Sequence, residues 1–589
     1  MKVSVVSINA KYVHTGLAGR YLVQESQKME EALVVQREFS INQPIEMIVS
    51  ELMRDKSDAY GFSTYIWNMG EVLQIIRRMK KIRPEVILFL GGPEVSYEED
   101  VLMRKEPSID FVVRGEGEGP FKALIAAGFS PKHYGQIPSL SYRLGQEIIC
   151  NPLGQPTPME SLPVGYTEED FSVPGKIFYY ESSRGCPYRC AFCLSAQDGN
   201  RVRVRPLDQV KRHMKWFLDH HVKQVKFIDR TFNADIERAL ELIDFLEANH
   251  NGITNFHFEC SPDRLTDEFI DRLARLPEGM IQFEIGIQST NPETSRAIHR
   301  PREIEHYRKV IGQLREPENI HLHVDLIAGL PFEDYASFSN SFNDVFSLKA
   351  HVIQLGFLKL LKGSELRMRN LEYGLTCCDD PPYEVLKTPW LSYEDVQRLK
   401  WIEDMVDKYY NSQGFISSLP FAMTHFKSPF DFFEKLSEFW VENDLHLRKH
   451  RKGDLYQYLQ NFSEGWTWKE HELDEWEERL LFDSLYATGE AYRKDHEATK
   501  MKRSEKNKMV EGFLKDRLPT DSGKRKKQMP DVSIARFVNL GHLFKQDDSR
   551  GLTLVFHKKR VPLFVEPCRI YQLKEEENHV QFKRLDLCL

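Results

Sequence analysis

The chain has 589 residues, and its 80 lysines and arginines against 88 aspartates and glutamates give a formal net charge of -8 at pH 7. Hydrophobic residues at 41% and charged residues at 29% describe an ordinary soluble globular protein. The net charge argues against a protein whose whole surface binds nucleic acid, although a local basic patch is compatible with it. The length predicts roughly three or four domains.

No apolar run reaches the roughly 18 residues that a membrane-spanning helix needs, so we expect no membrane insertion. The first residues, Met1–Val6, lead into a strand pattern rather than a signal peptide. Nine cysteines are too few for a disulfide framework in a chain of this length. These features predict a cytoplasmic protein in which clustered cysteines serve metal chemistry.

The first 125 residues alternate apolar strands with helix-patterned segments. Strands are predicted at 3–8, 32–39, 59–63, 86–90 and 111–113, and helices at 45–53 and 72–82. This alternation implies an α/β domain with a doubly wound, mostly parallel sheet, in which ligands bind beyond the carboxyl ends of the strands. The glycines of the loops there would let the backbone approach a bulky ligand, although they also fit plain turns. No G-x-G-x-x-G opens a helix after the first strand, which disfavours a dinucleotide site.

Residues 126–175 are rich in proline and glycine and are interpreted as a linker with a small hairpin at 139–149. From 176 to 370 a strand-then-helix pattern repeats six times and predicts a partial (β/α)6 barrel with its chemistry at the carboxyl ends of the strands. The strands are expected at 177–181, 224–228, 255–259, 282–287, 321–328 and 352–358. The helices are expected at 207–220, 234–248, 268–276, 292–298, 303–314 and 335–348.

Three cysteines, Cys186, Cys190 and Cys193, follow the first strand of this barrel within eight residues. Iron-sulfur clusters are usually held by four thiolates, so three leave one iron open. A structural zinc site is the alternative, but it closes its tetrahedron with a fourth ligand and uses paired spacings. The nearest histidines lie in a predicted helix without forming a second half-site; they are His213, His220 and His221.

The spacing C-x3-C-x-Phe-C, with Phe192 directly before the third cysteine, resembles the signature of the radical S-adenosylmethionine (SAM) superfamily. The resemblance implies that the three cysteines hold one [4Fe-4S] cluster and that SAM chelates its open iron. It also implies SAM contacts at the strand ends. The residues matched by position are Asp229 for the amino group, Glu259 and Gln288 for the carboxylate and ribose, and Ile327, Gly329 and Leu330 for the adenine. Asp229 departs from the glycine-rich form of its motif, and each side chain could instead be a solvated loop residue.

Placed ahead of this signature, residues 1–125 resemble the Rossmann-like cobalamin-binding domain of B12-dependent radical SAM enzymes. The residues that the resemblance assigns to cobalamin are His14, Thr15, Gly16, Ser63, Gly91, Gly92, Ser96, Gly115 and Glu116. The D-x-H-x-x-G motif that supplies a histidine to cobalt is absent from the sequence. We therefore expect cobalt without a strong histidine ligand and keep His14 as a candidate, since imidazole is a common metal ligand.

Residues 371–530 are helix-patterned and aromatic, which is more typical of a core than of a stacking platform. The charged stretch at 492–527 is interpreted as a solvated helix or mobile loop, with phosphate contacts to RNA as the alternative. Residues 531–589 predict a small β-rich cap. This C-terminal part resembles an extension of unknown function found in one branch of the family. Only Cys150 precedes the motif and only Cys377, Cys378, Cys568 and Cys588 follow the barrel, so a single cluster is expected.

The resemblance implies an enzyme that cleaves SAM to a 5'-deoxyadenosyl radical and methylates an unactivated carbon, with an electron donor such as flavodoxin or ferredoxin. One alternative is a cyclase, rearrangement or reduction enzyme of the same family. The other is a metal-binding RNA or partner adaptor with a structural cluster. The sequence leaves the substrate open among RNA, a peptide and a small molecule.

Overall fold

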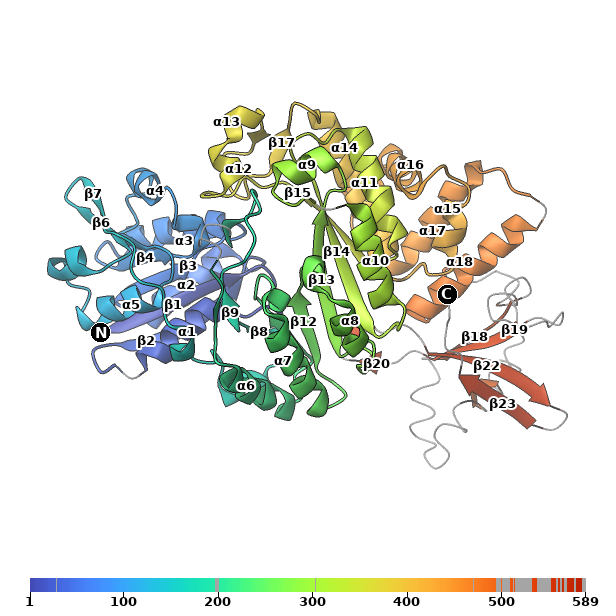
Figure 1. The fold of residues 1–589 in the computed structure, drawn as a ribbon, viewed down its shortest axis with the longest axis horizontal. Helices are drawn as coiled ribbons and strands as arrows, with labels where there is room; N and C mark the ends of the chain where they lie inside the picture. Colours follow the sequence, from blue (N-terminus) through green and yellow to red (C-terminus); the bar gives the residue numbers. More distant parts are fainter. Residues whose placement is uncertain are drawn as a thin grey trace. The chain divides into compact units, whose positions relative to one another are not determined.

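The structure is a computed structural model that describes residues 1–27, 29–195, 201–301, 303–469 and 471–493, with short segments beyond. Those segments are 499, 509–511, 513 and six strands between 532 and 584. Apart from Arg493, the lysines and arginines of the charged stretch lie outside the described residues, as do Cys568 and Cys588. The chain forms two compact units, one of residues 1–344 with 355–396 and one of residues 345–354 with 397–589 (Figure 1).

The first sheet is the predicted doubly wound one, with neighbours in the order β2-β1-β3-β4-β5 and every pair parallel. Its strands are β1 (Lys2–Asn9), β2 (Leu33–Ser40), β3 (Ala59–Ser63), β4 (Ile87–Gly91) and β5 (Phe111–Val113). Its helices are α1 (Leu17–Ser26), α2 (Ile45–Asp55), α3 (Met69–Ile82), α4 (Glu99–Lys105) and α5 (Glu118–Ala126). The hairpin expected in the linker, β6 (Leu140–Leu144) and β7 (Glu147–Cys150), pairs antiparallel with β5 and extends this sheet.

Alternation of side chains along these strands builds a separate apolar core on each face of the sheet. Val6 and Ile8 pack with residues of α2 and α3 on one face, whereas Val3 and Val5 pack on the other. The second core contains a stacked pair of rings, Phe89 and Phe111, with centroids 4.9 Å apart. Two covered faces explain why the strands are almost continuously apolar.

The second sheet has six strands in the order β15-β14-β13-β12-β11-β8, and the pairs from β8 to β14 are parallel. The strands are β8 (Phe178–Tyr180), β11 (Gln224–Phe227), β12 (Asn255–Glu259), β13 (Ile281–Gln288), β14 (Ile320–Ala328) and β15 (Val352–Phe357). The helices are α6 (Leu207–Asp219), α7 (Ile236–Ala248), α8 (Asp267–Leu273), α9 (Pro292–Ala297), α10 (Ile304–Arg315) and α11 (Tyr335–Ser347). All six predicted strand-helix units are present, each within a few residues of its expected bounds.

The C-terminal region is helical and then β-rich, as predicted. Its main helices are α14 (Tyr393–Met405), α15 (Ser418–Met423), α16 (Pro429–Glu442), α17 (Lys452–Phe462) and α18 (Glu472–Thr488). Trp440 and Trp476 are fully buried, which is the core role expected of the aromatic residues. An antiparallel sheet follows in the order β18 (Val532–Phe537), β19 (Leu552–His557), β22 (Arg569–Glu576) and β23 (His579–Arg584). No helix in the described part of the chain is both long and apolar enough to cross a membrane.

Candidate active site

The loop that carries the three cysteines lies between two short strands that pair with each other. β9 (Ser183–Arg184) pairs antiparallel with β10 (Arg203–Val204). Gly185 follows β9 with a φ of +93°, and a Cβ there would lie 2.0 Å from the Arg201 carbonyl oxygen. Only glycine allows this close approach of the two backbones. The strand pair therefore fixes the chain directly before Cys186. We call the segment between β9 and β10 the cluster loop and the strand pair its base.

Within this loop the three thiols differ in their surroundings. Cys190 is 8% exposed, and Cys186 and Cys193 are half-buried. The Cys193 N–H donates to the Cys190 carbonyl at 3.0 Å. The Cys186 sulfur lies 3.4 Å from the Thr231 hydroxyl. No three His, Cys, Asp or Glu side chains among the residues with described placement converge to hold a single metal ion.

Arg300 stands beside the cluster loop, and sequence reasoning missed it. Its guanidinium Nη1 lies 3.8 Å from the Cys190 sulfur, and its Nη2 donates to the Gly286 carbonyl at 2.8 Å. Burial raises the pKa of Cys190, and the positive charge of Arg300 opposes that rise. A single arginine between two helices has no distinctive sequence signal. It becomes visible only through its distance to the thiol.

Two unpartnered oxygen atoms lie in the carboxyl-terminal halves of neighbouring strands β13 and β14. Gln288 is 7% exposed with a φ of +72° after a β-bulge, and its Oε1 finds no hydrogen-bond partner in the described structure. The Oδ1 of Asp325, which pairs in register with Gly286, is also buried without a partner. Burial and the nearby Glu284 and Glu259 raise the pKa of Asp325 well above its usual range. Acceptors without donors fit the hydroxyl groups of a ribose.

Asp325 was not predicted, although it stands two residues before Ile327 on an inward-facing position of β14. Glu259, which was predicted, lies 3.8 Å from the Arg230 guanidinium, and its pKa is raised by burial. The structure thus brings Gln288 and Glu259 to the same edge as Asp325.

The predicted adenine wall and the motif aromatic also meet. Leu330 belongs to an apolar cluster with Ala191 of the cluster loop, and Ile327 and Phe192 pack against it half-buried. Gly329 has a φ of +89°, and a Cβ there would lie 2.6 Å from the Val385 side chain. The segment from Ile327 to Leu330 therefore presents backbone and apolar surface next to the cysteines.

Asp229, which was predicted to contact the amino group of SAM, already accepts hydrogen bonds within the protein. Its side chain is 1% exposed and accepts hydrogen bonds from the Ser182 N–H at 2.7 Å, the Ser183 N–H at 3.0 Å and the Ser182 hydroxyl. A carboxylate with three donors and almost no exposure fits an anchor for the segment between β8 and β9.

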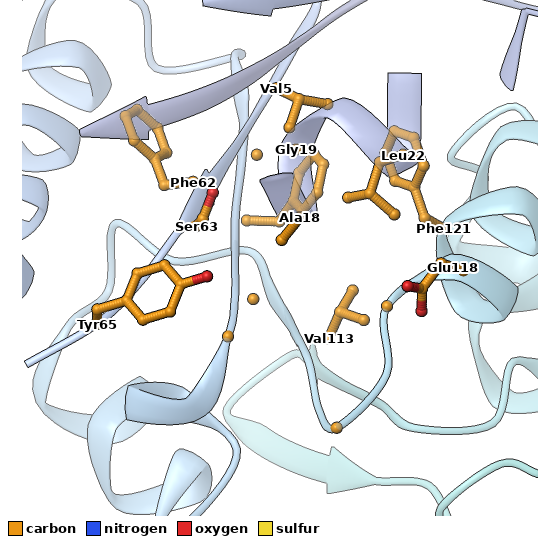
Figure 2. A pocket seen from close by; sticks show the side chains of 16 residues that line it. Val5, Ala18, Gly19, Leu22, Phe62, Ser63, Tyr65, Val113, Glu118 and Phe121 are labelled. Atoms are coloured by element: carbon orange, nitrogen blue, oxygen red, sulfur yellow. The ribbon is translucent and has the colours of Figure 1, made fainter. Parts of the chain in front are cut away.

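In the first domain a cavity of about 640 Å³, including the space at its open mouth, lies between one face of the sheet and α1 and reaches the loops that follow β3, β4 and β5. Four predicted residues line it: Ser63, Gly91, Gly92 and Gly115. Figure 2 shows apolar side chains around the cavity, with Glu118 beside Phe121. Sequence reasoning missed this apolar lining, which includes Leu22, Phe62, Phe89, Val113 and Phe121.

Two glycine-bearing loops of this cavity are tied together by Ser96. Its hydroxyl donates to the Gly92 carbonyl at 2.8 Å and accepts from the Gly115 N–H at 2.9 Å. Gly92 has a φ of +118°, and a Cβ there would lie 2.5 Å from the Thr64 carbonyl oxygen. Ser96 thus shapes the loops from outside the cavity lining.

The predicted residues after β1 contact β8, the linker and β2. The His14 Nδ1 is 2.6 Å from the Tyr179 hydroxyl, and burial together with the charge of Lys11 lowers the pKa of His14. The Thr15 hydroxyl lies 2.9 Å from the Tyr166 hydroxyl. The Gly16 N–H donates to a carboxylate oxygen of Glu38 at 3.4 Å.

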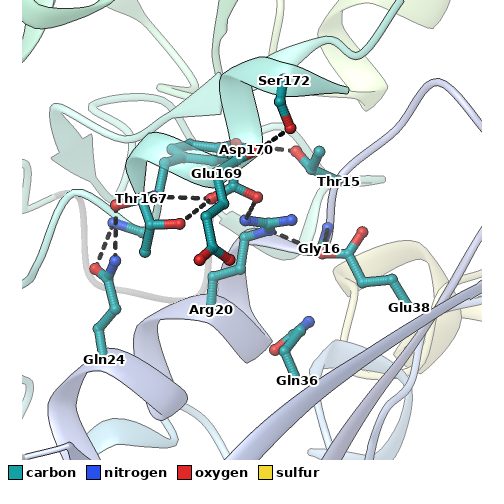
Figure 3. A network of polar contacts seen from close by, with 12 residues as sticks. Thr15, Gly16, Arg20, Gln24, Gln36, Glu38, Thr167, Glu169, Asp170 and Ser172 are labelled. Atoms are coloured by element: carbon teal, nitrogen blue, oxygen red, sulfur yellow. Dashed lines mark hydrogen bonds and ion pairs between the residues drawn. The ribbon is translucent and has the colours of Figure 1, made fainter. Parts of the chain in front are cut away.

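Figure 3 shows Arg20 of α1 between two carboxylates, one of which comes from the linker. The guanidinium is 2.6 Å from Asp170 and 2.8 Å from Glu38. The Gln24 amide also donates to the Tyr166 carbonyl at 2.8 Å. These contacts fasten the linker to the first domain.

The inner face of the second sheet is polar, whereas closed barrels usually fill theirs with Val, Ile and Leu. Register places two rows across the strands, one of Tyr179, Lys226, His257, Gln282 and His321 and one of Glu259, Glu284 and His323. Glu284 accepts from Lys226 at 3.1 Å and from His257 at 3.0 Å. Although burial opposes its ionisation, these partners lower the pKa of Glu284 to about 2. Burial lowers the pKa of His323 to about 4.

Comparison with known families decides what this arrangement is. A family model described as a B12 binding domain matches residues 4–125, and the radical SAM superfamily model matches residues 180–345. The chain combines a B12-binding domain with a radical SAM domain. A third model, described as a protein of unknown function (DUF4080), matches residues 371–547. The predicted family and its C-terminal extension are confirmed.

Relatives of this B12-binding radical SAM protein include named methyltransferases. It is 27% identical over 362 residues to the cobalamin-dependent radical SAM methyltransferase TokK of Streptomyces tokunonensis, covering 58% of this chain and 52% of that one. It is 27% identical over 317 residues to the 2-(S-pantetheinyl)-carbapenam-3-carboxylate methyltransferase of Streptantibioticus cattleyicolor, covering 50% and 45%. The chain thus spans about half the length of these relatives.

The fold is similar to that of the cobalamin-dependent SAM radical enzyme OxsB, solved with aqua-cobalamin and SAM bound. The TM-score is 0.59 at 15% identity, and the match covers 90% of this chain and 83% of that one. This likeness supports the predicted fold class.

Proposed function

We propose that this radical SAM protein is a cobalamin-dependent methyltransferase that methylates an unactivated carbon of its substrate. The observation that carries the proposal is that the segment containing Glu118 contributes to both the candidate cobalamin cavity and the base of the cluster loop. Glu118 lines the cavity of the B12-binding domain and pairs at 2.7 Å with Arg184, two residues before the first cysteine. A methyl donor and a radical generator must act on one substrate, and this shared segment supports their proximity.

The residues present fit the cofactors that the family implies. Cys186, Cys190 and Cys193 would hold a [4Fe-4S] cluster, and the cavity with its glycine loops would hold part of cobalamin. When bound, the cluster would supply the electron that cleaves SAM to methionine and a 5'-deoxyadenosyl radical, and cobalamin would supply a methyl group for transfer. An electron donor such as flavodoxin or ferredoxin would supply the electron.

Around SAM, the chain would supply acceptors, an apolar wall and a cation. The unpartnered oxygens of Gln288 and Asp325 would accept from the ribose hydroxyls. Ile327 and Leu330 would pack against the adenine. Arg300, already within reach of Cys190, would keep positive charge beside the thiolates. The orientation of SAM would thus depend on side chains from several strand ends.

The polar inner face of the second sheet supports a polar substrate. Lys226 is neutralised by Glu284, and the lowered pKa values of His257 and His323 leave their imidazoles uncharged at neutral pH. A face with paired charges and neutral imidazoles offers both donors and acceptors without attracting a polyanion. We expect a substrate whose reacting part carries amide, hydroxyl or ring-nitrogen groups.

The test is anaerobic reconstitution with iron, sulfide, dithionite, hydroxocobalamin and SAM that carries a trideuteromethyl group. The proposal predicts 5'-deoxyadenosine together with labelled methylcobalamin, and a labelled product when fractions of small polar metabolites are added. Formation of 5'-deoxyadenosine without any labelled methylcobalamin would favour the cyclase, rearrangement or reductase alternative. Absence of both would favour an adaptor with a structural cluster.

A further inference from the structure

Two arginines stand opposite each other at the base of the cluster loop. Arg184 ends β9, Arg203 begins β10, and the two residues are paired in register across the strands. All three cysteines lie between them in the chain. Any movement of these arginines therefore moves an end of the loop that would hold the cluster.

Both arginines form ion pairs with one short segment of the B12-binding domain, residues 114–118, which leads from β5 into α5. Arg184 reaches Glu116 at 3.0 Å and Glu118 at 2.7 Å, and Arg203 also pairs with Glu116. The Thr157 N–H completes the set by donating to Glu116 at 2.7 Å. Two glutamates spaced by one residue thus meet two arginines that face each other across a strand pair.

The pair of Arg184 with Glu118 is sheltered from water, whereas the side chains of Arg203 and Glu116 are 31% and 25% exposed. The side chains of Arg184 and Glu118 are 14% and 7% exposed. Burial opposes the ionisation of Glu116, but the charges of Arg184 and Arg203 lower its pKa. Ion pairs with this little exposure are weakly screened and hold a defined geometry, unlike exposed pairs.

The segment 114–118 also forms part of the candidate cobalamin cavity. Gly115, Gly117 and Glu118 all line that cavity. A ligand that enters it must contact the same residues that the arginines hold. Binding of a ligand in the cavity would therefore affect the same ion pairs that hold the base of the cluster loop.

We infer that Arg184 and Arg203 are positioning residues that couple the two cofactor sites, so that assembly of the cluster strengthens cobalamin binding. The inference rests on the proposed function, because it requires both groups to bind. Coupling between two sites is reciprocal in free energy and is commonly fivefold or more in affinity. It is measurable without knowledge of the substrate.

The experiment titrates the full-length protein with hydroxocobalamin by absorbance, before and after anaerobic reconstitution of the cluster. In the wild type, the dissociation constant should fall at least about fivefold when the cluster is present. In Arg184→Met the ratio of the two constants should approach one, and Arg203→Met should reduce it. Arg184→Lys, which keeps one cation, should recover part of the ratio.

Arg77→Met is the matched control, since it breaks a partly buried pair with Glu106 in the same domain away from the cavity. It should keep the wild-type ratio, and circular dichroism should show that every variant is folded. A ratio near one in the wild type, or an unchanged ratio in folded Arg184→Met and Arg203→Met, overturns the coupling alone. Failure of the wild type to bind hydroxocobalamin in either state overturns the proposed function as well.

Discussion

At the scale of single residues, the candidate SAM site contains buried oxygen atoms that have no hydrogen-bond partner in the described structure. Most buried polar atoms in proteins have a partner, and unpartnered ones call for an explanation. The Oδ1 of Asp325 and the Oε1 of Gln288 lack partners in the carboxyl-terminal halves of adjacent strands within the described structure. A bound ribose would satisfy both.

Asp325→Ala should raise the dissociation constant for SAM about tenfold, because the loss of a buried acceptor for a hydroxyl donor costs on the order of 1.5 kcal/mol. Asp325→Asn keeps an acceptor oxygen of the same shape and should bind SAM within about threefold of the wild type. Equilibrium dialysis of the reconstituted proteins measures both. Equal affinity of the alanine variant and the wild type would show that this oxygen does not contact SAM.

Glu333 should make folding depend on pH. Its side chain is fully buried, one oxygen accepts from Ser289 at 2.6 Å and from Ser341 at 2.8 Å, and burial raises its pKa to about 7. Because the folded state holds this proton more tightly than the unfolded state, its contribution to stability is complete below the unfolded pKa, near 4.5, and declines as pH rises through about 7.

The decline is at most about 1.4 kcal/mol per pH unit. Glu333→Gln cannot ionise, so its stability deficit against the wild type should narrow between pH 5 and pH 8. Urea unfolding of both proteins at the two pH values measures this. A deficit that stays constant would show that Glu333 does not titrate in this range.

At the scale of elements, the strand pair β9–β10 depends on Gly185. A Cβ at this position would meet a backbone oxygen at 2.0 Å, and the φ of +93° disfavours any other residue. Gly185→Ala should therefore lower the iron bound after reconstitution and destabilise the loop by roughly 2 kcal/mol or more. Gly252 also has a positive φ but has open space around it, so Gly252→Ala is the control. Iron retention equal in the two variants would argue against this role of the strand pair.

The strands also show which parts of the fold can be predicted from the sequence alone. The longer strands were predictable because they are largely apolar runs that alternate with helix-patterned segments. β9 and β10 were not, because each has only two residues and their arginines are paired with Glu116 and Glu118 from a distant part of the chain. Local pattern contains no information about such partners.

The site divides in the same way. The cysteine spacing is a local motif, so the sequence predicts it. Asp325 and Arg300 can be assigned to the site only from the residues that surround them in space. Asp229 and Thr15 were expected to contact cofactors, and in the structure Ser182 donates to Asp229 and the Tyr166 hydroxyl lies beside that of Thr15. Sequence position identifies the edge of a sheet but not the direction in which each side chain points.

At the scale of the whole first unit, a second tie joins the B12-binding domain to the radical SAM part. Glu94, which follows the glycine pair of the β4 loop, is 3% exposed and pairs with Lys362 at 3.1 Å and with the Tyr383 hydroxyl. A buried carboxylate that loses its cation is costly.

Lys362→Met should consequently destabilise the first unit by about 3 kcal/mol. Lys435→Met, which removes an exposed pair with Glu438, should change stability by less than about 1 kcal/mol. Thermal unfolding of the three proteins gives the comparison. A Lys362 variant as stable as the Lys435 variant would show that this tie contributes little.

The most direct test of the whole account is SAM cleavage by the reconstituted wild type and by Cys190→Ala under identical anaerobic, reducing conditions. The three-cysteine loop is the feature on which every other inference depends. We predict that the wild type binds iron and releases 5'-deoxyadenosine, and that the variant loses both. Full SAM cleavage by a variant without iron would contradict the account.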